Sequence, residues 1–267
     1  MAGESRDLDR RCDVLRSLHS PGTPLVLPNA WDVASARAVE AAGFPVVATT
    51  SGGVAAALGY EDHEHAPGDE MLAAAARICR GVDVPVTVDA EAGYGMDPAE
   101  LVAALQDAGA AGCNLEDTDH AAGELRDPES QAAWLRGVRE AASASDYGPV
   151  INARIDVFLT ALLAGSDTPQ RELLPDALER ARMYTGSGVD CVFPIALWEV
   201  DAVREFVAGS PGPVNILETP RAPAIGALAE LGVARVSYGS VVHRDVMDQF
   251  TRVLGAIASE TKGVDRR

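Results

Sequence analysis

Two carboxylates one residue apart, Asp89 and Glu91, follow a short apolar run and lead directly into glycines. Side chains at positions i and i+2 of a strand point to the same side. The run 84–88 has the composition of a buried parallel strand, and Asp97-Pro98 is typical of a helix start. In α/β folds the carboxyl ends of the strands face the ligand, and clustered carboxylates suit a hard cation such as Mg²⁺. The spacing indicates a metal site, with solvated loop acids as the simpler alternative.

Polar residues also follow the neighbouring candidate strands. Asn114 and Glu116 share one face at the end of the run 112–116, which adds a third carboxylate. Arg154 follows the run 150–153 and offers a cation there, with a structural ion pair as the alternative. Hydroxyls and bare amides after the second strand suit a carboxylate or phosphate, with an ordinary Gly-rich turn as the alternative. The residues of that turn are Ser51, Gly52 and Gly53, and later strand ends add Asn215, Glu218 and Ser240.

Eight short apolar runs alternate with Ala-rich segments whose apolar residues are spaced for one helix face. The expected strands are 25–28, 45–49, 84–89, 112–116, 150–153, 190–194, 214–217 and 234–238. The expected helices are 34–42, 99–108, 131–144, 176–186 and 224–231. Eight β/α units without a linker predict one domain over 1–267, a single (β/α)₈ barrel of TIM type, with a doubly wound sheet as the alternative. We expect little structure in the tails 1–6 and 262–267.

Composition limits the class of partner. The chain has 267 residues, 47% of them hydrophobic, which is enough for one large core. It shows neither an apolar run of about 18 residues nor a secretory leader, so we expect a cytoplasmic protein without a membrane partner. A net charge of −18 argues against nucleic acid as a partner, and a site that accepts anions then needs its own local cation. The 4 widely spaced cysteines are expected to be reduced.

The ordered set of motifs over residues 12–258 resembles the isocitrate lyase and phosphoenolpyruvate mutase superfamily. The motifs are Pro28-Asn29-Ala30-Trp31-Asp32, Thr50-Ser51-Gly52-Gly53, Gly59-Tyr60-x-Asp62, Asp89-x-Glu91-x-Gly93-Tyr94-Gly95, Asn114-Leu115-Glu116-Asp117 and Asn152-Ala153-Arg154-x-Asp156. The resemblance implies an α/β barrel whose last helix is exchanged between paired subunits. It also implies a homo-oligomer, usually a dimer of dimers and therefore a homotetramer.

The resemblance further implies how the site works. Mg²⁺, with Mn²⁺ as a possible substitute, would hold a small 2-oxo or 2-hydroxy carboxylate, largely through water. The residues near the metal would be Asp62, Asp89, Glu91 and Glu116. Arg154 would contact the substrate and an enolate-like intermediate. The substrate carboxylate would be bound by Ser51, Gly52 and Gly53, with Asn215 as a further candidate.

The loop after the fourth strand departs from the family pattern. In isocitrate and methylisocitrate lyases this loop carries a Lys-Arg/Lys-Cys-Gly-His motif whose cysteine is the acid/base, and in phosphonate mutases it carries Lys and Asn. The loop 117–125 has no cysteine and no lysine. His120 and Glu124 are the candidates for proton transfer, with a solvated flexible loop as the alternative. We therefore do not expect isocitrate or methylisocitrate lyase activity.

Three functions remain compatible with the sequence. The first is a Mg²⁺-dependent lyase or hydrolase that cleaves a C–C bond in a small 2-oxo or 2-hydroxy dicarboxylate, such as oxaloacetate or a malate derivative. The second is a C–P bond enzyme, either a phosphonopyruvate hydrolase or a phosphoenolpyruvate or carboxyphosphoenolpyruvate mutase. The third is a non-catalytic carboxylate-binding protein. The presence of the acidic cluster together with Arg154 favours an enzyme, because binding alone does not require groups that stabilise an enolate.

Overall fold

The computed structural model describes residues 2–261. Its parallel strands form a six-stranded sheet of order β2–β3–β4–β5–β8–β9 and a three-stranded sheet of order β1–β11–β10. A bridge between Val192 and Val214 joins the two sheets. The strands are β1 (Leu25–Leu27), β2 (Asn29–Ala30), β3 (Val47–Thr49), β4 (Val86–Asp89), β5 (Gly112–Glu116), β8 (Val150–Ile155), β9 (Cys191–Pro194), β10 (Asn215–Leu217) and β11 (Arg235–Ser237).

The strand order separates the two predicted folds. Strands that follow one another in the chain are neighbours in the sheets, and all eight predicted runs contain a strand. A doubly wound sheet would reverse direction after its first strands, so the sequential order is instead consistent with a TIM-type barrel. The first strand is divided into β1 and β2 at Pro28, whose ring nitrogen cannot donate a hydrogen bond to a neighbouring strand.

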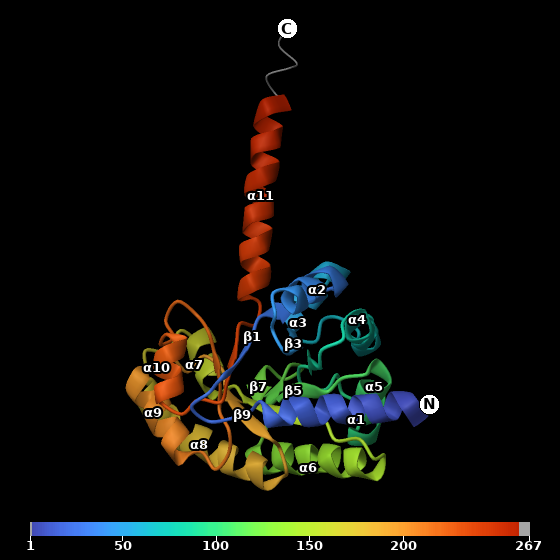
Figure 1. The fold of residues 1–267 in the computed structure, drawn as a ribbon. Coiled ribbons are helices and arrows are strands. Elements are labelled where there is room, and N and C mark those ends of the chain that lie inside the picture. The colour runs from blue at the N-terminus through green and yellow to red at the C-terminus, as the bar shows by residue number, and fades with distance from the viewer. Residues whose placement is uncertain (1, 262–267) are drawn as a thin grey trace.

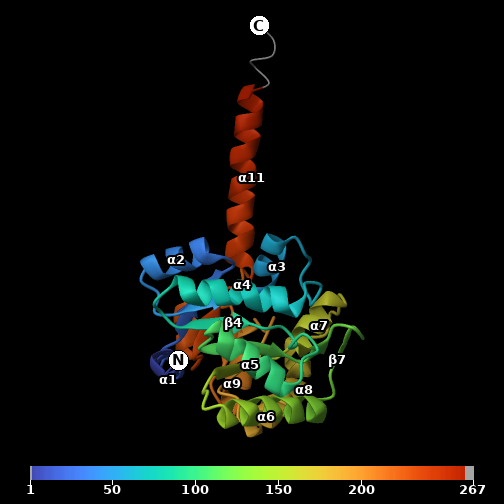
Figure 2. The same cartoon turned by 90° about the vertical axis from the view of Figure 1, so that its right-hand side faces the viewer.

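Helices surround the sheets, as Figures 1 and 2 show. The five predicted helices are all found, and their starts follow the expected chemistry: Asp97 caps α5 and exchanges hydrogen bonds with Glu100 in a capping box. The segment 2–6, expected to be a tail, belongs to the first helix, while Met1 and 262–267 lie outside the described residues. The helices are α1 (Ala2–Ser17), α2 (Val33–Ala41), α3 (Ser51–Leu58), α4 (Gly68–Gly81), α5 (Pro98–Ala108), α6 (Pro128–Ala144), α7 (Val157–Leu163), α8 (Gln170–Gly186), α9 (Val200–Gly209), α10 (Ile225–Glu230) and α11 (Val241–Thr261).

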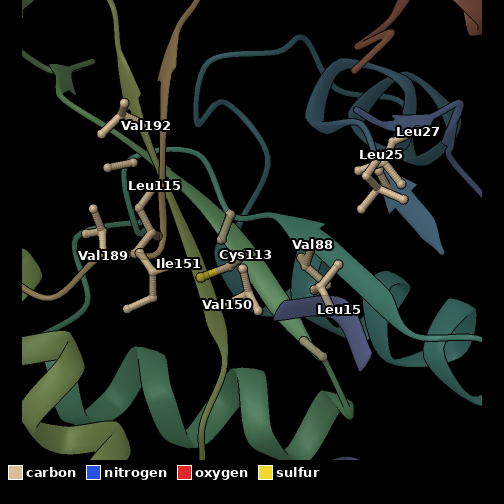
Figure 3. Close-up of a cluster of buried hydrophobic side chains, with 14 of the residues drawn as sticks. Leu15, Leu25, Leu27, Val88, Cys113, Leu115, Val150, Ile151, Val189 and Val192 are labelled. Carbon is tan, nitrogen blue, oxygen red and sulfur yellow. The ribbon is translucent and has the colours of Figure 1, made fainter. Parts of the chain in front are cut away.

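The apolar core lies inside and around the sheets. Figure 3 shows Cys113 and Leu115 of β5 beside Ile151 of β8, with Leu15 of α1 close to the same strands. The cysteines are free and buried, as expected for small apolar side chains in a core. Among the described residues, no helix is both long enough and apolar enough to cross a membrane.

Two elements differ from the β/α units. The loop after β5 forms a short antiparallel hairpin of β6 (Thr118–Asp119) and β7 (Glu124–Leu125) rather than an open loop. Helix α11 projects away from the body in both ribbon views (Figures 1 and 2) and has no buried residue. Large apolar side chains exposed along this helix are Val246, Met247, Phe250, Val253, Leu254 and Ile257.

Candidate active site

Three carboxylates gather at the carboxyl ends of β4 and β5. Asp89 is the last residue of β4 and Glu116 is the last residue of β5. Glu91 lies beyond its strand, in a turn where its backbone φ is 47°. The sequence predicted that Asp89 and Glu91 share one face of a strand, which is wrong because β4 ends at Asp89. A left-handed turn, and not strand alternation, brings Glu91 to the carboxylate cluster. Arg154 of β8 is the register partner of Glu116, which brings a cation to the same edge.

Burial sets the charge state of these carboxylates. Glu91 is only 3% exposed, and desolvation raises its pKa to about 8. Desolvation also raises the pKa of Asp89, and it holds the pKa of Glu116 well above the usual range, although the charge of Arg154 opposes both shifts. Repulsion among neighbouring carboxylates adds to each increase. The cluster therefore favours a proton or another cation.

Arg154 is held by carboxylates on two sides. Its Nε and Nη2 donate to the two oxygens of Asp156 at 2.6 and 2.7 Å, and its Nη1 forms an ion pair with Glu116. The side chain is 8% exposed, so its charge acts in a low-dielectric environment. The contact with Asp156 is the structural ion pair that the sequence left open. The third nitrogen nevertheless contacts Glu116 of the acidic cluster.

His120 reaches the cluster from the β6–β7 hairpin. Its Nε2 lies 2.5 Å from Oε1 of Glu116, and its side chain is 11% exposed. The ring is tilted against that of His63, with centroids 5.4 Å apart. The hairpin thus places an imidazole next to the carboxylate that also contacts Arg154, which is a suitable arrangement for proton transfer.

The first turn of α3 approaches the cluster from the other side. The backbone N–H of Ser51 donates to Asp89 Oδ2 at 3.1 Å. Gly52 is needed for this approach, since a Cβ there would lie 2.7 Å from Oδ2 of Asp62 and 2.8 Å from Oγ of Ser240. The structure therefore brings Asp62 and the Ser-Gly-Gly turn to the same place as Asp89.

A strained turn fixes Glu91. The N–H of Glu64 donates to Glu91 Oε1 at 2.7 Å, and the N–H of Tyr94 donates to Glu64 Oε1 at 2.6 Å. Glu64 and Tyr94 have φ of 58° and 56°, values that non-glycine residues rarely adopt. On the far side, Trp134 packs so closely on Gly93 that a Cβ there would lie 2.7 Å from the indole. Glu64 could not be identified from the sequence, because nothing near it in the chain shows the turn that it contacts.

A second buried network holds Asp156, the carboxylate that pairs with Arg154. Asp117, completely buried, accepts from the hydroxyl of Tyr184 at 2.7 Å and from Arg180 at 3.0 Å. Its other oxygen accepts from the N–H of Asp156 at 2.9 Å, and Thr118 donates to Asp156 at 2.6 Å. Burial raises the pKa of Asp117 to about 6. A sequence signal existed in α8, where Arg180 and Tyr184 are four residues apart on the helix face that carries Ala177 and Ala181, but it did not reveal their partner.

Two candidates are separate from the cluster. Asn215 is completely buried, and both its amide nitrogen and its amide oxygen bond to the hydroxyl of Ser237, at 2.9 and 3.1 Å. Glu124 is exposed on β7, opposite Asp119. In the part of the chain that the structure describes, no hydrogen bond or ion pair connects either residue to the acidic cluster. Their roles stay predictions.

The donor set suits a hard divalent cation. Oδ1 of Asp62 and Oδ1 of Asp89 are buried without a hydrogen-bond partner. Within residues 2–261, no three or more His, Cys, Asp and Glu side chains are grouped closely enough to hold one ion directly. Mg²⁺ commonly keeps several waters and uses only one or two carboxylates, so the residues fit the water-mediated binding that the family resemblance implies.

Comparison with known proteins identifies the family. The profile of the phosphoenolpyruvate phosphomutase family matches residues 15–258. The chain belongs to this family. It is 37% identical to an uncharacterized protein of Mycobacterium tuberculosis over 84% of this chain and 81% of that protein. It is 33% identical to a Corynebacterium glutamicum protein named "probable 2-methylisocitrate lyase 2" over 90% of this chain and 79% of that one.

Solved structures of family members agree with this assignment. A structure from Burkholderia cenocepacia J2315 described as a "putative phosphonomutase" is 41% identical, with a TM-score of 0.86 over 92% of this chain and 99% of the other. The superfamily resemblance inferred from the motifs is thereby confirmed. The named relatives include both a lyase and a mutase, so membership of the phosphoenolpyruvate phosphomutase family does not fix the reaction.

Proposed function

We propose that this family member is a Mg²⁺-dependent lyase or hydrolase that cleaves a C–C bond in a small 2-oxo or 2-hydroxy dicarboxylate through an enolate-like intermediate. The observation that carries the proposal is the contact of Arg154 with Glu116 beside buried carboxylate oxygens that lack partners. When bound, Mg²⁺ would act as a Lewis acid on a substrate oxygen. Asp62, Asp89, Glu91 and Glu116 would hold it, largely through water.

The residues of the chain have distinct roles in this proposal. The turn of Ser51, Gly52 and Gly53 binds the substrate carboxylate, with the N–H groups of Gly52 and Gly53 as donors, since the N–H of Ser51 already donates to Asp89. Arg154 orients the carbonyl group and stabilises the negative charge that develops on it, because a fixed guanidinium in a dry site needs no reorganisation. His120 moves a proton at Nε2, where Glu116 holds the imidazole in place. Glu124 stays a candidate for proton transfer only if the hairpin moves. Asn215 stays a candidate for binding only if the substrate reaches below the mouth of the site, by which we mean the carboxyl ends of the strands with the acidic cluster.

The charge of the mouth favours a carboxylate over a phosphonate as substrate. A phosphonate group carries up to two negative charges where a carboxylate carries one, so it needs more cations or amides around it. Arg154 already shares its charge with Asp156 and Glu116. A C–P enzyme is the second candidate, and the observation in its favour is the 41% identity to the Burkholderia protein described as a phosphonomutase. Carboxylate binding without catalysis is the third.

We also propose that the two sheets close into a barrel and that α11 packs on a partner subunit in a homotetramer built as a dimer of dimers. The exposed apolar side chains of α11 support this, because a helix with such a face is stable in water only when that face is covered. Sedimentation of the full chain, compared with a Phe250→Glu variant, tests the proposal. Tetramers for both proteins would contradict it.

A metal-supplemented substrate screen tests the function. Purified protein would be assayed with Mg²⁺ or Mn²⁺ against oxaloacetate, alkylmalates, 2-methylisocitrate, isocitrate and phosphonopyruvate, with pyruvate, glyoxylate, oxalate and phosphate as measured products. Metal-dependent release of oxalate or pyruvate without phosphate would support the proposal. Release of phosphate from phosphonopyruvate would establish the second candidate, and binding of carboxylates without turnover would establish the third.

A further inference from the structure

Arg235 is a buried cation that the proposed reaction does not use. It lies on β11 and is 0% exposed. Its Nε donates to Ser237 at 3.3 Å and its Nη2 to Asn114 at 3.1 Å, while Nη1 has no hydrogen-bond partner among the described residues. Burial lowers its pKa, but a guanidinium remains charged in proteins. In the described part of the chain, none of these nitrogens bonds to a carboxylate.

The neighbours of Arg235 place it directly beneath the acidic mouth. Its partner Asn114 is in register with Asp89 of β4, and two residues further along β5 is Glu116. Two residues of a strand span about 7 Å, and both side chains point to the same side. The guanidinium of Arg235 therefore bonds to the residue that lies beside Asp89 in the sheet and two positions before Glu116 in the strand.

An isolated charge in a protein interior is costly, and an apolar side chain of similar size would fill the same volume. Arg235 nevertheless keeps a charge at this position, beneath the four carboxylates of the candidate metal site, in a chain of net charge −18. We propose that Arg235 is a positioning residue whose charge balances the mouth, so that a doubly negative substrate can bind beside the carboxylates. The same charge weakens the hold on a divalent metal. This inference rests on the proposed metal- and carboxylate-binding function.

Two substitutions at this position separate charge from hydrogen bonding. Arg235→Gln keeps polar atoms and removes the charge, whereas Arg235→Lys keeps the charge and loses the planar fork. Ser237→Ala is the matched control, because it removes one partner of Arg235 and leaves the guanidinium. The readouts are the Kd of Mn²⁺, measured by electron paramagnetic resonance, and the Kd of oxalate at saturating Mn²⁺.

If Arg235 acts through its charge, removal of that charge should change the affinities for Mn²⁺ and for oxalate in opposite directions. Arg235→Gln is expected to bind Mn²⁺ about three- to thirtyfold more tightly and oxalate more weakly by a similar factor, as for one charge acting over roughly 10 Å in a medium of intermediate dielectric. Arg235→Lys and Ser237→Ala are expected to stay within about threefold of wild type for both ligands. A residue with only a structural role would instead weaken both ligands when it is replaced.

Any result other than opposite changes in the two affinities overturns the proposed charge role of Arg235. Weaker binding of both ligands by Arg235→Gln, or binding equal to wild type, would exclude the charge role while wild-type binding still supports the proposed function. Wild-type protein that binds neither Mn²⁺ nor oxalate would overturn the proposed function and this inference with it. If Arg235→Gln does not fold, the Kd of oxalate for Arg235→Lys is measured instead, at a pH of about 6.5, where an amine keeps its charge more readily. A Kd equal to that of the wild type supports the inference, and a tenfold loss of affinity overturns it.

Discussion

Asp190 and Asp89 lie at opposite ends of the strands and differ in how completely their carboxylates are hydrogen-bonded. At the amino-terminal end, Asp190 accepts from Arg16 at 3.0 Å, from Arg139 at 2.5 Å and from the N–H of Ile151 at 2.8 Å. At the carboxyl end, one oxygen of Asp89 is buried without a partner. A charge whose hydrogen bonds are complete stabilises the native fold. A buried charge whose bonds are incomplete costs stability, and its cost is recovered when a ligand binds.

Backbone strain follows the same division. Residues other than glycine with positive φ are concentrated around the mouth, where His63, Glu64, Glu91 and Tyr94 have φ between 47° and 70°. Such conformations cost free energy and persist only where their surroundings enforce them. The exchange of hydrogen bonds between Glu64 and the turn after β4 provides that enforcement. The strained backbone around the mouth thus fixes the positions of the site residues at a cost in stability.

Removal of Asp89 tests this comparison most severely. Asp89→Asn keeps the size of the side chain and removes a charge that desolvation already disfavours. We expect metal-dependent turnover to fall by at least about 10³-fold, because the metal loses a ligand that positions it. Steady-state kinetics and Mn²⁺ binding would be measured together, with circular dichroism as the control for folding. Full activity, or activity that persists with excess chelator, would show that the cluster does not hold a metal.

Arg154→Lys is expected to cost about 10²- to 10³-fold in turnover. A lysine cannot make the two-point contact with Asp156 while it also reaches Glu116, so the charge would be kept but displaced. The loss should fall mainly on kcat if the contact strengthens in the transition state. Arg139→Lys, at the other end of the strands, is the matched control and should change stability rather than kcat. Wild-type kinetics for Arg154→Lys would make this residue structural and favour the carboxylate-binding alternative.

His120→Asn is expected to lower kcat by about 10²-fold, the usual loss when one positioned acid or base is removed. The structure supports this because Nε2 of His120 contacts Glu116, whereas Glu124 is an exposed residue of β7. Glu124→Gln is therefore the informative comparison, with an expected change below about threefold. A larger loss for Glu124→Gln than for His120→Asn would show that the hairpin rearranges before reaction.

Much of the fold could be predicted because each β/α unit carries its own local signal. Eight apolar runs and five helices were found where their periodicity placed them, and the carboxyl ends of the strands placed Asp89, Glu116 and Arg154 at one edge. Helices α3, α4, α7 and α9 were not predicted, and neither was the helical start of the chain. A last helix that leaves its own core was expected only from the family resemblance, because the apolar face of α11 resembles that of any packed helix.

The remaining site residues depend on contacts that no local pattern reports. Glu64 acts on Glu91 across 27 positions, and Arg180 bonds to Asp117 across 63. Arg235 is an arginine in an apolar strand, which indicates burial but not what lies above it. Such residues become visible only when the strands are assembled, because the partners come from different β/α units.

The stability of the metal-free protein should fall as the pH rises from about 5 to about 8. The folded-state pKa of Glu91 is about 8, above its ordinary 4.5, so in this interval the native state binds more protons than the unfolded state. Asp117, with a pKa of about 6, acts in the same direction. We expect Tm to drop by about 3 °C or more and Mg²⁺ to restore part of the loss, because the ion binds the native state. Differential scanning calorimetry with and without Mg²⁺ would show this. A Tm that rises through the interval would contradict the raised pKa of Glu91.

The smallest effect on turnover is expected at Asp190, the fully bonded counterpart of Asp89. Asp190→Asn removes the charge that holds Arg16 and Arg139, and it leaves two guanidinium groups without their shared partner. Because the pair is partly exposed, the cost should be about 1 to 3 kcal/mol of unfolding free energy, with kcat within twofold of wild type. Urea unfolding and steady-state kinetics, performed on Asp190→Asn and Asp89→Asn together, would complete the comparison. We expect stability to fall in the first variant, and to rise or stay unchanged in the second because a frustrated charge has been removed. The same response from both variants would mean that the two ends of the strands do not differ in the way their carboxylates are used.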